Sequence, residues 1–258
     1  MLNPDIDVNV ALGFWPFQRL LIQTPAALAK HLQRHQIGGG LVRCVESILY
    51  PDPDEYDEEC FAKLSRYPAL RPVKTLNALH PQCLESLDDF RARFPIAGIA
   101  LYPNYHLYEL SDPRVAAIMR AAAKLRLPVL IPVRVEDERG QHWRMPVPAV
   151  PLAEIRELAT AHPRTRIVAL NTYAYELGPL RGDSSCPANL FLDFAYCEGP
   201  DTLHRITAGI PAKQFVFGSG TPWLTTESAL AKLRLGTTAT ADRKRILAST
   251  KRFAPSSP

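Results

Sequence analysis

The sequence has little that points to disulfides, membranes or nucleic acids. Its five cysteines are odd in number and have no Cys-x-x-Cys spacing, which favours free thiols in a reducing compartment over a disulfide framework or a zinc knuckle. No apolar run approaches the roughly 20 residues that a membrane span needs, and the first residues lack the pattern of a signal peptide. The 30 Lys and Arg are scattered among 26 Asp and Glu. Without a basic stripe, nucleic acid is a poor partner, so we expect a cytoplasmic protein that binds neither membranes nor nucleic acids.

The sequence also lacks linkers, internal repeats and low-complexity segments, apart from a short Pro/Ser tail. A chain of 258 residues with 47% hydrophobic content is long enough for one large core. We therefore expect a single domain over residues 1–258, with a short disordered tail after about residue 253.

Apolar runs of strand length alternate with segments of helical period along the whole chain. The runs expected to be strands span residues 6–12, 40–47, 71–79, 97–103, 128–135, 166–172, 189–196 and 214–220. Most are almost continuously apolar, as in parallel strands that are covered on both faces. Eight such units in this length predict a single (β/α)₈ TIM barrel, an α/β fold. The alternative, an open doubly wound sheet, is disfavoured because no Gly-rich phosphate loop follows the first strand.

Several of the intervening helices have recognisable starts. Thr24 is a predicted cap with Pro25 at the first helical position, and Pro113 opens another helix after Ser111 and Asp112. The stretch "YAYELGPLRGDSSCP" after the sixth strand predicts a loop, at most with a single turn.

In this fold the active site is built at the C-terminal ends of the strands. Two stretches there are rich in chemically useful side chains. "LYPNYHLYE" supplies Tyr102, Tyr105 and His106, which can polarise a carbonyl or hold a planar ligand. "RVEDERGQHW" supplies Arg134 and Glu136, alternating so that both can point into the barrel mouth, where the cation can bind a carboxylate.

Further strand ends complete the predicted site. Asp193 is the remaining candidate for proton transfer at the end of the seventh strand. The other candidate substrate-binding residues are Asn9, Trp15, Arg43, Asn77, Asn104, Tyr105, His142, Asn171, Ser219 and Trp223.

The segments "IDVNVALGFWPF", "GIALYPNYHLYELSDPRV", "AAAKLRLPVLIPV" and "FVFGSGTPW" resemble the amidohydrolase-related branch of the metal-dependent TIM-barrel hydrolases, over nearly the whole chain. This resemblance implies a His-x-His pair on strand one, histidines on strands five and six, and an aspartate on strand eight, which together hold a divalent metal. The corresponding positions here are Asn9, Ala11, a position near Pro132, Asn171 and Gly220. Since Ala, Pro and Gly offer no side-chain donor, the ordinary metal site cannot form.

Three hypotheses follow. The first is a metal-independent hydrolase of lactonase type, or a lyase, acting on a small carboxylate-bearing substrate without a cofactor. In it Arg134 and Arg43 bind the carboxylate, and Glu136 or Asp193 handles protons.

The second hypothesis is a non-catalytic binding or scaffold protein. The third is a divalent metal such as Zn at a relocated site built from His106, His142 and either Asp193 or Glu136. Aromatic residues in the first loop are compatible with a homodimer.

Overall fold

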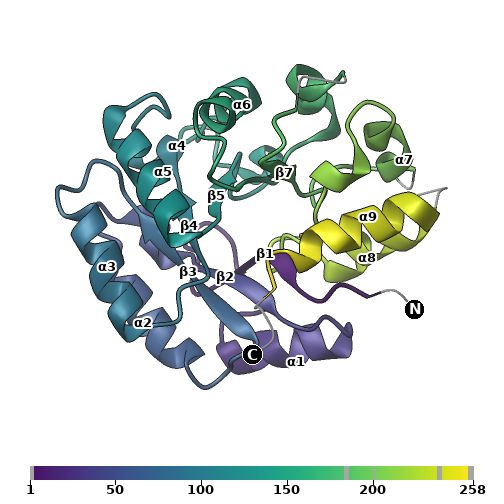
Figure 1. Cartoon of the computed structure of the whole chain (residues 1–258). Helices are drawn as coiled ribbons and strands as arrows, with labels where there is room; N and C mark the ends of the chain where they lie inside the picture. The colour runs from purple at the N-terminus through teal and green to yellow at the C-terminus, as the bar shows by residue number, and fades with distance from the viewer. Residues whose placement is uncertain (1–2, 183–185, 200, 237–239, 255–258) are drawn as a thin grey trace.

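A curled sheet of seven parallel strands forms the centre of the molecule, and the strands follow each other in space as they do in sequence (Figure 1). The computed structural model describes residues 3–182, 186–199, 201–236 and 240–254. Its strands are β1 (Asp7–Leu12), β2 (Gly40–Cys44), β3 (Leu70–Leu76), β4 (Gly98–Leu101), β5 (Val129–Pro132), β6 (Ile167–Leu170) and β7 (Leu190–Leu192). Six of them lie within predicted strands, and β3 begins one residue before its predicted strand.

Helices surround the outside of the sheet (Figure 1). The α-helices are α1 (Pro25–Arg34), α2 (Asp54–Leu64), α3 (Cys83–Arg93), α4 (Pro103–His106), α5 (Pro113–Leu125), α6 (Leu152–Ala161), α7 (Thr202–Thr207), α8 (Thr226–Leu235) and α9 (Thr240–Lys251). The 3₁₀ helices are η1 (Glu46–Leu49), η2 (Glu138–Gly140), η3 (Ala174–Leu180) and η4 (Ala212–Gln214). The Thr24 hydroxyl accepts the Ala27 N–H at the start of α1, as its sequence predicts. The segment predicted as a loop after strand six contains the η3 helix.

The eighth predicted strand is not a regular strand. Residues 215–221 make one isolated bridge to β7 and one to β1. Three of the N–H groups in this segment bond to side chains: Phe217 N–H donates to Thr250 Oγ1, Ser219 N–H donates to Asp7 Oδ1, and Thr221 N–H donates to Ser219 Oγ. Gly220 has a positive φ of 73°. These diversions break the ladder, so the sheet has seven strands and the expected full barrel is not established.

Two apolar layers stabilise the sheet. Alternate residues of successive strands, such as Val8, Leu41 and Val73, form a cluster inside the curl. The intervening residues, such as Val10 and Val42, pack against the helices outside. This two-sided burial explains the continuous apolar runs in the sequence.

Lys74 of β3 points outward and anchors α2. Its ammonium lies 2.9 Å from Asp57 Oδ2 and 2.8 Å from Asp54 Oδ1, and it also lies over the Phe90 ring. The Lys74 and Asp57 side chains are fully buried. Ser47 donates a further hydrogen bond to Asp57, at 2.5 Å. This group belongs to the layer between sheet and helices, outside the curl.

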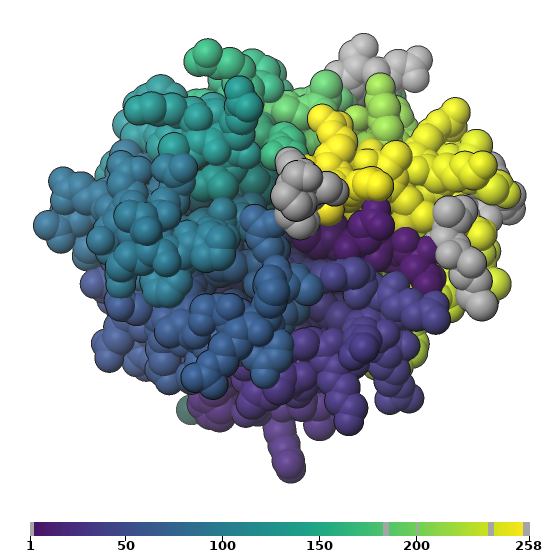
Figure 2. Space-filling model, turned by 60° about the horizontal axis from the view of Figure 1, so that its bottom comes forward, coloured from purple at the N-terminus to yellow at the C-terminus, as the bar shows by residue number. Residues whose placement is uncertain are grey.

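The first and last parts of the chain adjoin. Figure 2 shows the C-terminal helix in yellow beside the N-terminal residues in purple, and Lys251 Nζ lies 3.8 Å from Asp5 Oδ2. Among the described residues, no helix is both long and apolar enough to cross a membrane. Of the disordered tail predicted after about residue 253, residues 255–258 lie outside the described residues.

Candidate active site

A buried polar network occupies the C-terminal end of the sheet interior. Asn9 of β1 donates through Nδ2 to Asp193 Oδ2 and, at 2.6 Å, to Asn171 Oδ1. The Asn171 backbone N–H donates to Asp193 Oδ1 at 2.9 Å. On its other side, Asn9 Oδ1 accepts a hydrogen bond from Arg43 Nη2. Residues from four segments, all named as candidates from the sequence, therefore meet in one network.

Arg43 is buried without forming an ion pair in the described part of the chain. Its side chain is only 2% exposed, yet no carboxylate of the described residues lies within ion-pair distance of it. Its hydrogen-bond partners are the Asn9 amide and, weakly at 3.5 Å, the Tyr102 hydroxyl, and its Nε has none. A buried charge is costly unless it is paired. The arrangement leaves a positive site that favours an incoming anion.

Arg134 is equally buried but fully paired. Its Nη1 and Nη2 bind the Glu176 carboxylate as a fork, and its Nε donates to Glu138 Oε1 at 2.9 Å. The guanidinium also stacks on the Tyr173 ring, with Cζ 4.1 Å from the centroid. Both carboxylates compete with a substrate for this cation. Arg134 and Glu136 were both expected to point into the barrel mouth. The hydrogen bonds of Arg134 do not include Glu136, because Arg134 turns toward the loop after β6.

Two buried carboxyl groups in this region hold protons unusually strongly. Burial raises the pKa of Asp193 to about 6, although the hydrogen bond from Asn9 opposes this. Burial likewise raises the pKa of Asp7 to about 7; its Oδ1 accepts the N–H groups of Asn9 and Ser219, while its Oδ2 has no partner. A carboxyl group that titrates near neutrality can both donate and accept a proton there.

Trp15 crosses the mouth of the sheet. It lies in the loop after β1, yet its indole N–H donates to Glu136 Oε2, after β5, at 2.8 Å. Its ring contacts Tyr105 edge-on, with centroids 6.0 Å apart, and Trp223 at 5.8 Å. With 1% exposure, Trp15 is fully covered and packs in the same cluster as Tyr102. The polar network therefore lies beneath an aromatic cover, and Glu136 holds that cover in place.

His106 is a neutral, structurally engaged histidine. Burial lowers its pKa to about 4, and its Nε2 lies 3.1 Å from the Ile48 carbonyl oxygen. A carbonyl only accepts, so Nε2 carries the proton and Nδ1 is left as an acceptor. In this tautomer His106 has no N–H free to polarise a substrate carbonyl. Together with Tyr105, His80 and Asn77 it lines a cavity of about 430 Å³ beside the mouth.

The remaining predicted residues are dispersed. Asn77 donates to the Pro51 carbonyl, and Asn104 donates to the Pro148 carbonyl. His142 is exposed, and Ser219 is buried against Thr221. These side chains stabilise loops or face solvent, and only Trp223 touches the aromatic cover.

The residues present do not fit a divalent metal at the positions that the resemblance implies. Asn9 and Asn171 do meet, but Ala11, Pro132 and Gly220 have no side-chain donor atom. The Asn9 oxygen is bound to the Arg43 guanidinium, whose charge repels a second cation. In the part of the chain that the structure describes, no group of three His, Cys, Asp or Glu side chains is arranged to hold a metal, so the relocated site predicted from His106 and His142 has no assembled ligand set.

Three functional neighbours escaped the sequence reasoning. Glu176 comes from the segment predicted as loop, Asp7 from the interior of a strand, and Glu138 from the charged stretch that follows β5. For Asp7 a signal existed, since it alternates with Asn9 along the strand. For Glu176 no local pattern indicated that it would pair with Arg134.

Comparison with solved structures shows a shared fold. A 2,6-dihydroxybenzoate decarboxylase complexed with 2,6-dihydroxybenzoate matches with a TM-score of 0.74 and 16% identity, over 98% of each chain. A 5-carboxyvanillate decarboxylase from Sphingomonas paucimobilis matches at 0.74 and 10%, over 98% of this chain and 99% of that one. A dihydroxybenzoic acid decarboxylase from Polaromonas sp. JS666, with bound manganese and 2-nitroresorcinol, matches at 0.73 and 13%, over 98% and 97%.

Structures described as an amidohydrolase and as a TIM-barrel protein match as well. These matches confirm an α/β fold of TIM-barrel type, while the full eight-stranded barrel is not established. A scan against protein-family models and a search of curated proteins gave no match.

Proposed function

We propose that this protein is a (β/α)₈-type enzyme acting on a small carboxylate-bearing substrate, without a bound divalent metal. The observation that carries the proposal is the buried Arg43 guanidinium without an acidic partner, linked through Asn9 to the titratable Asp193. Decarboxylases of hydroxybenzoates share the fold, which supports an aromatic carboxylate as the substrate class.

In the proposed complex the substrate carboxylate binds Arg43, because a guanidinium and a carboxylate form charge-assisted hydrogen bonds. Tyr102 adds a hydroxyl, which accepts weakly from Arg43 and keeps its own proton for donation to the ligand. Asn9 and Asn171 orient Asp193 through one hydrogen bond each, and a further hydrogen bond joins the two amides. Arg134 orients the loop after β6 rather than the substrate, since Glu176 and Glu138 occupy its donors.

Asp193 is the proposed proton-transfer group. As a lyase, the enzyme breaks the bond between the carboxylate and the adjacent carbon, and the proton of Asp193 replaces carbon dioxide on that carbon. As a hydrolase, the ionised Asp193 instead takes a proton from the attacking water. A pKa of about 6 makes both protonation states accessible near neutrality.

The test uses protein dialysed against a chelator. It is incubated with 2,6-dihydroxybenzoate, with release of carbon dioxide as the readout, and with small carboxylated lactones, with ring opening as the readout. We expect turnover of one class, abolished in Asp193→Asn while benzoate binding persists. Turnover that depends on added Mn²⁺ or Zn²⁺ would contradict metal independence.

A non-catalytic binding protein is the second candidate, and one observation favours it. Trp15 is fully covered and its indole is bound to Glu136 across the end of the sheet. Binding of benzoate without turnover of any carboxylate in the panel would support this function.

A further inference from the structure

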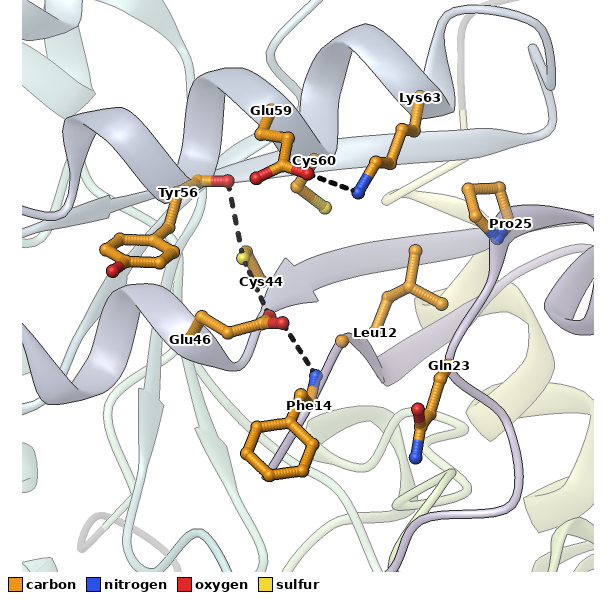
Figure 3. Close-up of a pocket in the computed structure, with 11 residues that line it drawn as sticks. Leu12, Phe14, Gln23, Pro25, Cys44, Glu46, Tyr56, Glu59, Cys60 and Lys63 are labelled. Atoms are coloured by element: carbon orange, nitrogen blue, oxygen red, sulfur yellow. Dashed lines mark hydrogen bonds and ion pairs between the residues drawn. The ribbon is translucent and has the colours of Figure 1, made fainter. Parts of the chain in front are cut away.

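The loop that carries Trp15 is held by a second carboxylate, on the opposite side from Glu136. Glu46, the first residue of η1, accepts the Phe14 backbone N–H at 2.8 Å through Oε1. Its Oε2 lies 3.5 Å from the Cys44 thiol, which donates to it. Figure 3 shows the Glu46 carboxylate reaching Phe14 at the edge of a cavity of about 190 Å³.

Gly13 makes this contact possible. Its φ is +121°, a conformation that side-chain-bearing residues rarely adopt. A Cβ at this position would lie 1.8 Å from Glu46 Oε2, so the carboxylate sits in the space that the missing side chain leaves. Close approach of Glu46 to the Gly13–Phe14 backbone therefore depends on glycine, for both conformational and steric reasons.

Trp15 follows this turn directly. The backbone N–H of its neighbour Phe14 is bound by Glu46 on the β2 side of the mouth, and its indole is bound by Glu136 on the β5 side. The loop is thus held at two points, and the indole packs in the same cluster as Tyr102, whose hydroxyl lies 3.5 Å from Arg43 Nη1. A ligand that approaches Arg43 from this end has to displace the indole.

We infer that Glu46 is a positioning residue of the site, which fixes Trp15 in the closed position and thereby limits access of an anionic ligand to Arg43. The inference rests on the proposed function for the identity of the ligand, but the tether itself does not. Opening exposes Arg43, and a population that is mostly closed lowers the apparent affinity for the ligand in proportion.

The tether is tested without any ligand, by NMR measurement of hydrogen exchange at the Trp15 indole N–H, assigned with Trp15→Phe. In Glu46→Ala we expect exchange to rise about tenfold, the factor that loss of an ordinary hydrogen bond gives. Glu46→Gln keeps an acceptor for Phe14 and should restore slow exchange. Glu59→Ala removes a carboxylate that lines the same cavity but pairs with Lys63, and it should change nothing.

Gly13→Ala provides an independent variant, since the added methyl group displaces Glu46. It should raise indole exchange as Glu46→Ala does, and the double variant should add little to either. Additive effects of the two substitutions would show that they act on different contacts and would overturn the coupling between Gly13 and Glu46.

Access is then measured as the association rate of benzoate by stopped flow. We expect faster association in Glu46→Ala than in the wild type. Unchanged indole exchange in Glu46→Ala overturns the tether. Raised exchange with an unchanged benzoate rate overturns control of access. If neither protein binds benzoate, the proposed function fails, while indole exchange still decides whether Glu46 positions Trp15.

Discussion

The Arg43 guanidinium and the Asp193 carboxyl group are joined through the amide of Asn9 and form no ion pair with each other. Asn9 Oδ1 accepts from Arg43, and Asn9 Nδ2 donates to Asp193. The amide therefore satisfies both groups and keeps them out of ion-pair contact, although the Arg43 charge still opposes the rise in the pKa of Asp193. This separation keeps Arg43 available to an anion and leaves Asp193 free to titrate, which are the two properties that the proposed chemistry needs.

Arg43 and Arg134 should differ in their effects on stability. Arg134→Met leaves Glu176 and Glu138 without their cation and should lower the free energy of unfolding by roughly 3 kcal/mol. Arg43→Met removes a buried charge that has no ion pair, although it leaves the Asn9 oxygen without its donor. It should therefore lower the free energy of unfolding clearly less than Arg134→Met does. Urea unfolding measures both. An equal or larger loss in Arg43→Met would argue that Arg43 is a structural residue.

The raised pKa of Asp7 predicts a pH-dependent stability. Its value of about 7 in the folded protein exceeds the ordinary 3.8, so the folded state binds the proton more tightly than the unfolded chain. The stabilisation is complete below about pH 4 and is lost as the pH rises through about 7. Asp193 contributes the same sign, and its stabilisation is lost as the pH rises from about 4 through about 6.

Asp7→Asn isolates the contribution of Asp7. The amide oxygen keeps the hydrogen bonds from Asn9 and Ser219, and the amide nitrogen replaces an oxygen that has no partner. Between about pH 5 and about pH 8, we expect the free energy of unfolding of the variant to rise relative to that of the wild type by on the order of 3 kcal/mol. Parallel stability curves for the two proteins would contradict an elevated pKa at Asp7.

The buried Lys74 group should matter far more than an exposed ion pair of the same kind. Lys74→Met leaves Asp57 buried and unpaired, for an expected loss of roughly 3–5 kcal/mol in the free energy of unfolding. Lys63→Met breaks an exposed pair with Glu59 and should cost less than about 1 kcal/mol. Comparable losses in the two variants would show that the Lys74 group does not anchor α2.

Much of the architecture could be predicted from the sequence, because parallel strands covered on both faces leave continuous apolar runs. The meeting of Asn9, Asn171 and Asp193 followed from their places at the ends of such strands. The prediction of a regular eighth strand was wrong. The side chains of Asp7 and Thr250 accept N–H groups of this segment that would otherwise bond to a neighbouring strand.

The partners of the charged residues could not be predicted in the same way. Whether Arg134 or Arg43 is free depends on the loop after β6, where Glu176 lies in a short 3₁₀ helix without a clear sequence pattern. The position of Trp15 depends likewise on Gly13, Glu46 and Glu136, which are far apart in the sequence. Such contacts arise from the path of loops, which hydrophobic periodicity does not encode.

The most direct test of the account is calorimetric titration of benzoate into chelator-treated protein. We predict binding to the wild type, loss of that binding in Arg43→Met, and unchanged binding in Arg139→Met. The last variant removes an exposed arginine that follows β5 and pairs with Asp137 and Glu198. Equal benzoate binding in the wild type and in Arg43→Met would contradict the central claim that the buried Arg43 is the anion-binding group of the site.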